Sequence, residues 1–434
     1  MYKLNLKLPH GKVAIITLIF SALVLFQIGG CTDSGSVGGS LPGSNSDVQV
    51  DTLEITGLQS DTLESFSGSL NFFSAGRFQD PLFGDLEATG LIKPALPASN
   101  EDLSFDNNTQ MRLRLAINRD AVYGDTLADA EFDLIELREI FRGNAFMLND
   151  EVQIPDIIDG EGPIMGTRVG SFTVNNEDTV EVELSPTWVS RYGSFYNSTA
   201  TNRDSAYVRE FFGLAVVPRN DVKIVAFNPI DSRFIATELE RSANADTTVS
   251  DSIGITAREW AFSLERTNIQ DSDPGSLKII STLERVIRFD FDFSLENLGS
   301  RNISRVELVF PRDNVLLDEN NLQPGVVRPL GNRLLLHSVE GDELPQSIDP
   351  GNPIGPPRSL PPTGFFDEEI RAYRIDVTPN VLSRQLENID ENQSFYLTLG
   401  ANNGLIRSSI LYNSEAAADN RPSVIITSVN TGDN

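Results

Sequence analysis

The stretch MRLRLAIN (residues 111–118) alternates apolar and polar residues with a period of two. Successive side chains of a β-strand point to opposite faces of a sheet, so one face of this stretch is apolar and the other is polar. The same alternation recurs in TVEVEL (179–184), RVELVF (305–310), RFDFDFS (288–294) and FYLTL (395–399). Half-buried strands of this kind are typical of antiparallel sheets, so the sequence predicts an all-β fold.

An internal repeat organises these strands. VELSPTWVSR (182–191) and IDVTPNVLSR (375–384) each place a hydroxyl residue and a proline after a strand, ahead of a short helical stretch. Ser185 and Thr378 suit the N-cap of a helix, and the proline after each suits the first helical position, where no N–H is needed. Apolar strands flank both copies, so the repeat indicates two similar units.

We therefore expect two tandem antiparallel β-sandwich domains of jelly-roll-like type, over residues 48–245 and 255–434. The stretch SANADTTVSDS (242–252) is small and polar, which favours a linker at residues 246–254. Residues 349–364 (DPGNPIGPPRSLPPTG) are rich in proline and predict an exposed loop within the second domain.

The N-terminal 47 residues have a different character. Three lysines precede an uncharged apolar run at residues 13–26, and Ile28-Gly29-Gly30-Cys31 follows. This order resembles the bacterial lipobox, which implies a signal peptide at residues 1–30 and lipid on Cys31; the alternative is a membrane anchor with an incidental cysteine. Residues 31–47 are Gly/Ser-rich and predict a flexible tether. Thr32 stands where inner-membrane retention would require aspartate, so we expect the outer membrane, facing the exterior.

Composition narrows the function. The formal net charge of −28 repels nucleic acid, so we expect no nucleic-acid partner. After the signal, the chain has three lysines and one histidine, His337, which lies in the strand-like stretch RLLLHSVE. A single histidine and a lipidated cysteine provide neither a histidine cluster for zinc nor a Cys–His pair, and we interpret His337 as structural. The prediction is a protein that is not an enzyme.

A family resemblance covers most of the mature chain. The series GRFQDPLFGDLEA (76–88), YGDT (123–126), VREFFGLAVVP (208–218) and ISRVELVF (303–310) resembles Bacteroidetes lipoproteins of unknown function. Their Gly-x-Tyr-x-Asp-Pro-x-Phe-Gly motif follows the lipid anchor, and Phe78 stands here where tyrosine is usual. The second repeat copy is also similar to DNRLRE-type jelly-roll modules. The resemblance implies a surface lipoprotein of β-sandwich modules and supplies no catalytic residues.

The motif GRFQDPLFG also has a plain structural interpretation. Asp80-Pro81 and Gly84 suit tight turns, because aspartate and proline favour turn positions and glycine tolerates positive φ. Phe78, Leu82 and Phe83 would then fill the edge of a core.

Aromatic and acidic stretches of the sequence supply the candidate binding residues. In TWVSRYGSFY (187–196), the candidates for glycan contact are Tyr192, Phe195 and Tyr196, since sugar C–H faces pack on aromatic rings. Trp188 aligns with Val381 of the second copy and is expected in the core. The turn DSDPG (271–275) could bind Ca²⁺ or be a solvated turn; no other cofactor is expected.

A further motif, Asp followed by Ser or Thr and then an apolar residue or Thr, resembles the O-glycosylation sequon of Bacteroidetes. It occurs at Thr52, Thr62, Thr126, Thr179, Ser205, Thr247 and Ser252. The same dipeptides also favour strand starts and turns, which is the alternative interpretation.

Three functions stay open. The first is a non-enzymatic surface module that binds polysaccharide or another outer-membrane protein. The second is a structural or accessory subunit of an outer-membrane assembly. The third is a glycoside hydrolase that uses two carboxylates, which 62 acidic residues leave open. We rank them in this order, with the membrane as a partner through Cys31 in each case.

Overall fold

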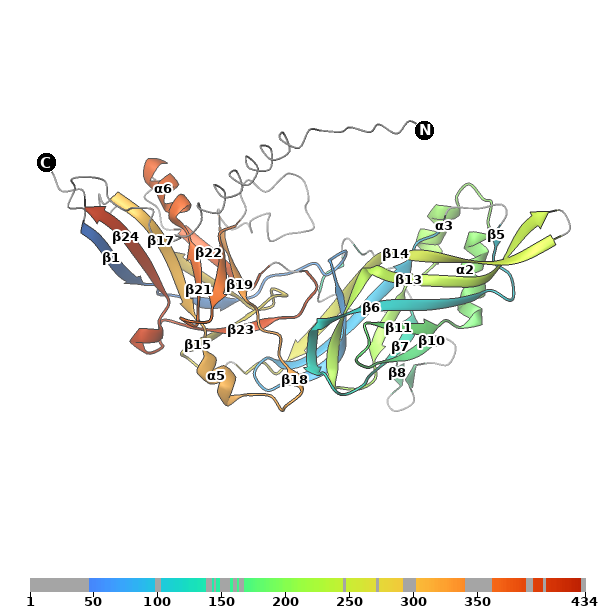
Figure 1. The fold of residues 1–434 in the computed structure, drawn as a ribbon, viewed down its shortest axis with the longest axis horizontal. Helices are drawn as coiled ribbons and strands as arrows, with labels where there is room; N and C mark the ends of the chain where they lie inside the picture. Colours follow the sequence, from blue (N-terminus) through green and yellow to red (C-terminus); the bar gives the residue numbers. More distant parts are fainter. Residues whose placement is uncertain are drawn as a thin grey trace, which may run out of the picture. The chain divides into compact units, whose positions relative to one another are not determined.

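The described chain is built almost entirely of antiparallel β-sheet (Figure 1). The computed structural model describes residues 47–97, 103–137, 143, 146–148, 157–158, 162–163, 168–244, 247–270, 273–291, 302–339, 361–387, 393–400 and 403–430. The predicted signal peptide, Cys31, nearly all of the tether and most of the proline-rich loop at 349–364 lie outside these residues. The all-β, sandwich-type fold predicted from the alternation is confirmed.

One sheet has eleven strands, in the order β10-β7-β12-β4-β14-β13-β6-β11, with β3, β5 and β18 attached to β4, β6 and β13. Its strands are β3 (Phe73–Asp80), β4 (Gly84–Pro94), β5 (Leu103–Ser104), β6 (Gln110–Asp125), β7 (Ala130–Glu136), β10 (Arg168–Val174), β11 (Thr179–Glu183), β12 (Leu214–Pro218), β13 (Lys223–Asn244), β14 (Thr247–Thr267) and β18 (Val326–Val327). The stretch 111–118 lies in β6, where Met111, Leu113 and Leu115 are buried as predicted.

The other large sheet has nine strands, in the order β1-β24-β17-β21-β20-β19-β22-β16-β2. Its strands are β1 (Asp47–Glu54), β2 (Gln59–Asp61), β16 (Val286–Phe291), β17 (Asn302–Pro311), β19 (Arg333–Ser338), β20 (Thr363–Asp367), β21 (Ala372–Asp376), β22 (Gln393–Thr398) and β24 (Ser423–Asn430). Two short pairs accompany these sheets: β15 (Ser276–Ile280) with β23 (Ser408–Tyr412), and β8 (Ile157–Ile158) with β9 (Gly162–Pro163).

Each large sheet encloses its own apolar core. In the eleven-stranded sheet, the rings of Phe73 and Phe227 stack at 5.3 Å between centroids. In the nine-stranded sheet, Phe289 stacks on Phe395 at 5.4 Å, and Ile279 of β15 joins the same cluster. Burial of such side chains is the main driving force for folding, since the chain has no cysteine pair.

The helices are short, and two of them, α2 and α6, belong to the repeat. They are α2 (Pro186–Tyr196), α3 (Arg203–Glu210), α5 (Asn314–Glu319), α6 (Thr378–Glu387) and the 3₁₀ turn η2 (Ala418–Asn420). Ser185 is the N-cap of α2, as predicted, and its Oγ accepts from the Trp188 N–H at 3.4 Å. In the second copy the helix begins at Thr378 itself, one residue earlier than predicted. Within the described ranges, no helix is long and apolar enough to cross a bilayer.

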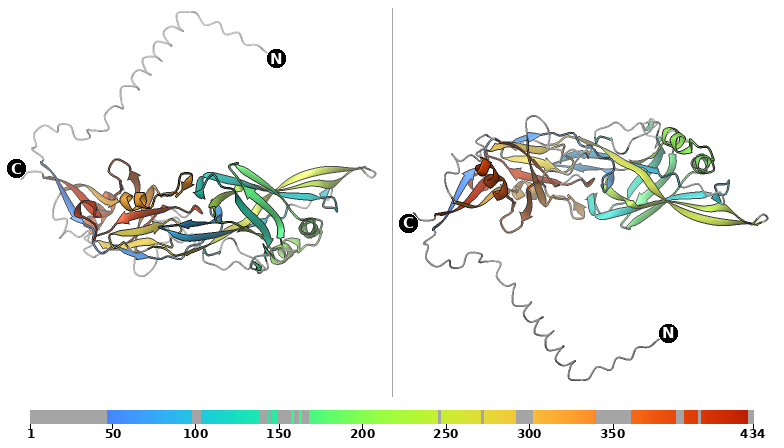
Figure 2. Two further views of the ribbon diagram at one scale, coloured as in Figure 1. Left: turned by 90° about the horizontal axis from the view of Figure 1, so that it is seen from below. Right: turned by 90° about the horizontal axis from the view of Figure 1, so that it is seen from above.

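The predicted linker at residues 246–254 is wrong. Residues 247–254 begin β14, which pairs with β13 through contacts such as Arg241↔Val249 and Ile235↔Gly254 (Figure 2). The stretch is polar because the outer part of this hairpin is solvated, not because the chain leaves the sheet. Residues 255–267 continue β14, and from Ala257 onward they pair with β4, so they belong to the eleven-stranded sheet instead of starting a second domain. Strands of both large sheets lie within one compact unit, Gln49–Ser428.

Candidate functional site

The motif GRFQDPLFG forms the β3–β4 hairpin, and its predicted turn is confirmed. Asp80 Oδ1 accepts from the N–H groups of Leu82 (2.8 Å) and Phe83 (3.0 Å), which closes the turn. Gly84 has φ +82°, and a Cβ there would lie 2.0 Å from the Thr267 carbonyl oxygen, so no other residue fits. Phe78, Leu82 and Phe83 are buried, as expected.

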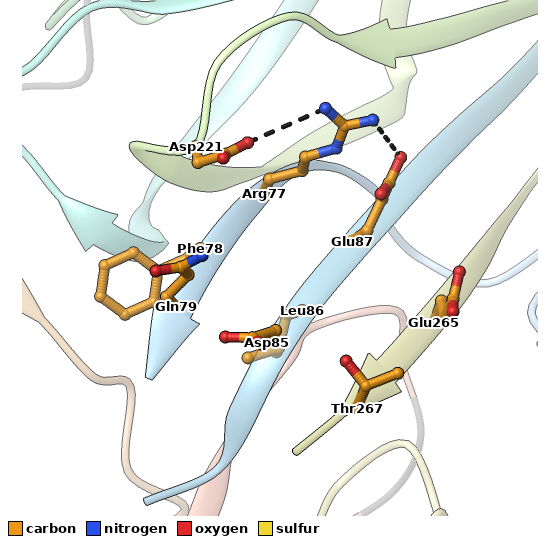
Figure 3. A pocket seen from close by; sticks show the side chains of 9 residues that line it. All are labelled: Arg77, Phe78, Gln79, Asp85, Leu86, Glu87, Asp221, Glu265 and Thr267. Carbon is orange, nitrogen blue, oxygen red and sulfur yellow. Dashed lines mark hydrogen bonds and ion pairs between the residues drawn. The ribbon is translucent and has the colours of Figure 1, made fainter. Parts of the chain in front are cut away.

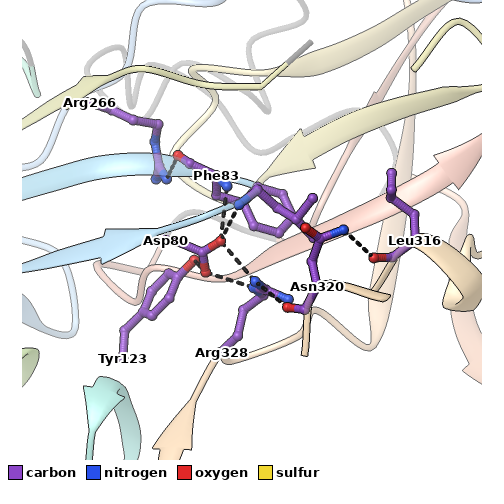
Figure 4. Close-up of polar contacts among 8 residues, drawn as sticks. Asp80, Phe83, Tyr123, Arg266, Leu316, Asn320 and Arg328 are labelled. Atoms are coloured by element: carbon purple, nitrogen blue, oxygen red, sulfur yellow. Dashed lines mark hydrogen bonds and ion pairs between the residues drawn. The ribbon is translucent and has the colours of Figure 1, made fainter. Parts of the chain in front are cut away.

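The Asp80 carboxylate is the centre of a buried polar network (Figure 4). Arg328 donates to it from Nε (2.7 Å to Oδ2) and Nη2 (2.9 Å to Oδ1), and the Tyr123 hydroxyl donates at 2.8 Å. The side chain of Asp80 is 0% exposed and that of Arg328 is 7% exposed. With the two turn N–H groups, five donors satisfy this one carboxylate, which is what a buried charge requires.

The electrostatics follow from these contacts. Burial alone would raise the pKa of Asp80, but the hydrogen bonds and charge of Arg328, with the two turn N–H groups, hold it below its usual value. Burial also raises the pKa of Tyr123, which therefore stays a neutral donor. The carboxylate is ionised at neutral pH and is fully occupied by the protein, so it is a structural group.

The tip of this hairpin also packs on distant parts of the chain. Leu82 and Phe83 form an apolar cluster with Ile280, Ile410 and Leu317 of α5. This packing adds an apolar contact to the ionic one.

Arg266 secures the hairpin from a second side (Figure 4). Its Nη1 donates to the Phe83 carbonyl at 3.1 Å, and its guanidinium pairs with Glu284. Sequence reasoning identified this motif but missed the pairing of Asp80 with Arg328, because the two residues are 248 positions apart.

The predicted glycan contacts are contradicted. Tyr192 is 0% exposed and Tyr196 is 4% exposed, and both pack on Phe105 of the segment that follows β5. Phe195 is half-buried against Tyr207. These rings form the core under α2, so no sugar can reach the faces of the two tyrosines. Trp188 and Val381 are core residues, as predicted.

An open polar pocket lies instead on the outer face of the β3–β4 hairpin (Figure 3). Its volume is about 300 Å³. Two rows of residues cross its floor from β3 through β4 to β14: Arg77–Glu87–Glu265 and Gln79–Asp85–Thr267. Three adjacent strands therefore fix the positions of these side chains.

Charge is unevenly compensated in this pocket. Arg77 donates to Glu87 at 2.6 Å and lies 3.8 Å from Asp221. Glu265 faces Glu87 across the strands, and like charges in that position repel. The Nε–H of Arg77 is buried and has no hydrogen-bond partner among the described residues. Because this N–H is fully buried, the pocket offers a ligand the part-exposed end of the Arg77 guanidinium and the carboxylate acceptors.

The remaining candidates from the sequence are His337, a metal site and the turn at 271–275. His337 lies in β19, is buried, and its Nε2 is 3.1 Å from Thr398 Oγ1; burial lowers its pKa to about 4. No three His, Cys, Asp or Glu side chains in the described ranges converge to hold a metal ion. Of the turn at 271–275, the first two residues lie outside the described chain, and Asp273 Oδ1 accepts from the Gly275 N–H at 2.8 Å.

The three lysines that follow residue 31 share one property: all are buried. Lys93, Lys223 and Lys278 are 1%, 2% and 8% exposed. The charged surface of the described residues is therefore built from arginine and carboxylates. Lysine is otherwise the residue type that is least often buried, so each of these positions needs a reason.

Comparisons with known proteins add little. No protein-family model matches the chain, and no curated protein matches it in sequence. The Faustovirus major capsid protein is 9% identical over 94% of this chain and 93% of its own, with a TM-score of 0.10. A structure of the Sputnik virophage is 9% identical over 99% of this chain and 90% of its own, with a TM-score of 0.09. Likeness this weak carries no argument.

Asp80→Asn should destabilise the protein by about 3–5 kcal/mol, because it leaves the buried Arg328 without its counter-charge. Urea unfolding measures the loss. Glu87→Gln is the control, and its loss should stay below about 1 kcal/mol because its ion pair is solvated. The pKa of Asp80 is lowered in the fold, so its contribution is present above about pH 4 and disappears as pH falls through the native pKa. A loss at neutral pH no larger than the control's would contradict this role.

Lys93→Met should change the pH dependence of stability. Burial lowers the pKa of Lys93 to about 8, with Glu259 opposing, and the ammonium lies 4.9 Å from the Tyr207 ring centroid. The unfolded state holds this proton up to about pH 10.4, so wild-type stability should rise by up to about 3 kcal/mol relative to the variant between pH 8 and 10.4. Urea unfolding of both proteins at pH 7 and pH 10 measures the difference. If the free energies of unfolding of the wild type and the variant change with pH in parallel, the Lys93 ammonium is not desolvated in the fold.

Proposed function

We propose that the chain is an outer-membrane lipoprotein, anchored through Cys31 and facing the exterior, that binds carbohydrate without catalysis. The observation that supports binding is the Arg77 pocket. Sugar hydroxyls both donate and accept hydrogen bonds, and the pocket presents the carboxylates of Glu87 and Glu265 beside the part-exposed guanidinium of Arg77. Rigid strands hold these groups in place, so little ordering is required when a ligand binds.

The lipid anchor rests on the order of residues before Cys31. A positive head, a short apolar run and small residues precede the cysteine, and the first described strand, β1, begins at Asp47. Two or more acyl chains anchor stably where one holds only marginally.

Cys31→Ser should move the protein from the membrane fraction to the soluble fraction and abolish incorporation of labelled palmitate. Fractionation of cells that express each form measures this. Thr32→Ser is the matched control and should leave the protein in the membrane. A Cys31→Ser chain that stays membrane-bound would indicate an uncleaved apolar anchor instead.

Saturable binding of at least one polysaccharide class should appear when the full chain, in detergent, is applied to a glycan array. Glu265→Gln and Arg77→Gln should each weaken it at least tenfold, because each replaces a charged hydrogen-bonding group on the pocket floor with a neutral amide. Glu183→Gln, an exposed position on β11, is the matched control and should bind normally. A blank array, or binding that both pocket variants leave unchanged, would overturn the proposal.

The sequon-like sites differ in access. Thr52, Thr62, Ser205 and Ser252 are exposed, whereas Thr126 and Thr179 are partly buried and the Thr126 hydroxyl donates to the Gly325 carbonyl at 2.8 Å. The side chain of Thr247 lies outside the described residues. If the chain is O-glycosylated, the four exposed sites are the ones we propose, and the intact mass of the protein reports it.

A second candidate function is a subunit of an outer-membrane assembly. Leu127 is 72% exposed and Val327 is 44% exposed, and both lie where β18 pairs with β6. The Thr126 N–H donates to the Gly325 carbonyl at 2.9 Å, which holds the two segments together. Exposed apolar side chains on paired segments are a feature of protein interfaces.

A further inference from the structure

A second pocket forms around a bulge in β6. In the pairing of β6 with β13, Ala226 faces Asn118 and Ile224 faces Tyr123. Residues 119–122 of β6 are thus set against the single residue Val225. Bulges of this kind are over-represented beside functional sites, because they redirect side chains out of the sheet.

This pocket has a volume of about 590 Å³, which is large enough for a small organic molecule. Asn118, Arg119 and Asp120 line it from the bulge, and Asn175 and Asp178 line it from the turn between β10 and β11. Val122 and Val174 supply apolar wall. Polar groups on an apolar wall are the usual composition of a ligand site.

Lys223, the first residue of β13, also lines this pocket. The residue is 2% exposed, but its ammonium is not among the fully buried, unpartnered polar atoms of the described residues, so the charged end still reaches the pocket. Burial lowers its pKa, and the charges of Asp129 and Asp125 oppose this. A mostly buried lysine side chain carries a desolvation cost, and a ligand anion in the pocket would reduce that cost.

The surrounding charges limit what that partner can be. Arg119 is already paired with Asp178 at 3.4 Å, which leaves Lys223 as the cation without a direct partner among the lining residues. Asp120 also lines the pocket, and Asp125 and Asp129 are near enough to act on Lys223. These aspartates repel a dianion such as phosphate about twice as strongly as a monoanion at the same distance, and the single ammonium can neutralise only one charge.

We infer that the β6-bulge pocket binds the carboxylate of a small organic acid, with Lys223 as its counter-ion and the amides of Asn118 and Asn175 as hydrogen-bond donors. The carboxylate belongs either to a simple organic acid or to a uronic acid. This site is separate from the Arg77 pocket and does not depend on the function proposed there.

The test is isothermal titration of the full chain, in detergent, with glucuronate, acetate, glucose and inorganic phosphate. Glucuronate should bind saturably, and glucose and phosphate should bind at least tenfold more weakly. Acetate affinity within tenfold of glucuronate identifies a simple carboxylate as the ligand, and a larger gap identifies a uronate; both support the site. If neither glucuronate nor acetate binds, or if phosphate binds more tightly than glucuronate, the inference is overturned.

The variants connect binding to Lys223. Lys223→Met should reduce glucuronate affinity at least tenfold, and Lys93→Met, which removes a buried lysine that does not line this pocket, should leave it unchanged. Equal loss in both, or no loss in Lys223→Met, overturns the inference. If the Lys223→Met chain does not fold, Asn175→Ala at the exposed rim decides: a threefold or greater loss supports the site, and unchanged affinity overturns it.

Discussion

The ion pair between Asp80 and Arg328 is the constraint on which the rest of this structure depends. A carboxylate and a guanidinium are both withdrawn from water, and the carboxylate is stable there only because five donors surround it. The pair joins the turn of the β3–β4 hairpin to the residue that follows β18, 248 positions later in the chain. Removal of either partner leaves a buried charge, so the two segments are interdependent.

Both proposed sites lie on strands that this interaction fixes. The Arg77 pocket uses the outer face of the hairpin whose turn Asp80 closes. The β6-bulge pocket uses the strand that carries Tyr123, a donor to Asp80, and that pairs with β18 just before Arg328. The same buried network therefore orders surfaces that do not touch it. Binding residues on such a scaffold need little reorganisation, which is how a rigid sheet favours affinity.

Local patterns predicted much of this fold. Alternation in MRLRLAIN identified β6, the Ser-Pro and Thr-Pro pairs marked the starts of α2 and α6, and Asp80-Pro81 with Gly84 marked a turn. The predicted domain boundary at 246–254 was wrong because a solvated hairpin needs no apolar residues, so its sequence resembles that of a linker. The prediction that Tyr192 and Tyr196 contact glycan was wrong because Phe105, about 90 residues earlier in the chain, covers them. For Lys223, the only indication in the sequence was the rarity of lysine in the chain. Nothing in the sequence indicated the pairing of Asp80 with Arg328.

The most direct test is a double-mutant cycle on Asp80 and Arg328. Asp80→Asn, Arg328→Met and the double variant are unfolded in urea at pH 7, and the free energies of unfolding are compared. We expect a coupling energy of about 2–3 kcal/mol, with the double variant more stable than the sum of the single losses implies, because it leaves no buried charge. Additivity within about 0.5 kcal/mol would show that the two side chains act independently, and it would contradict the central place given to this pair.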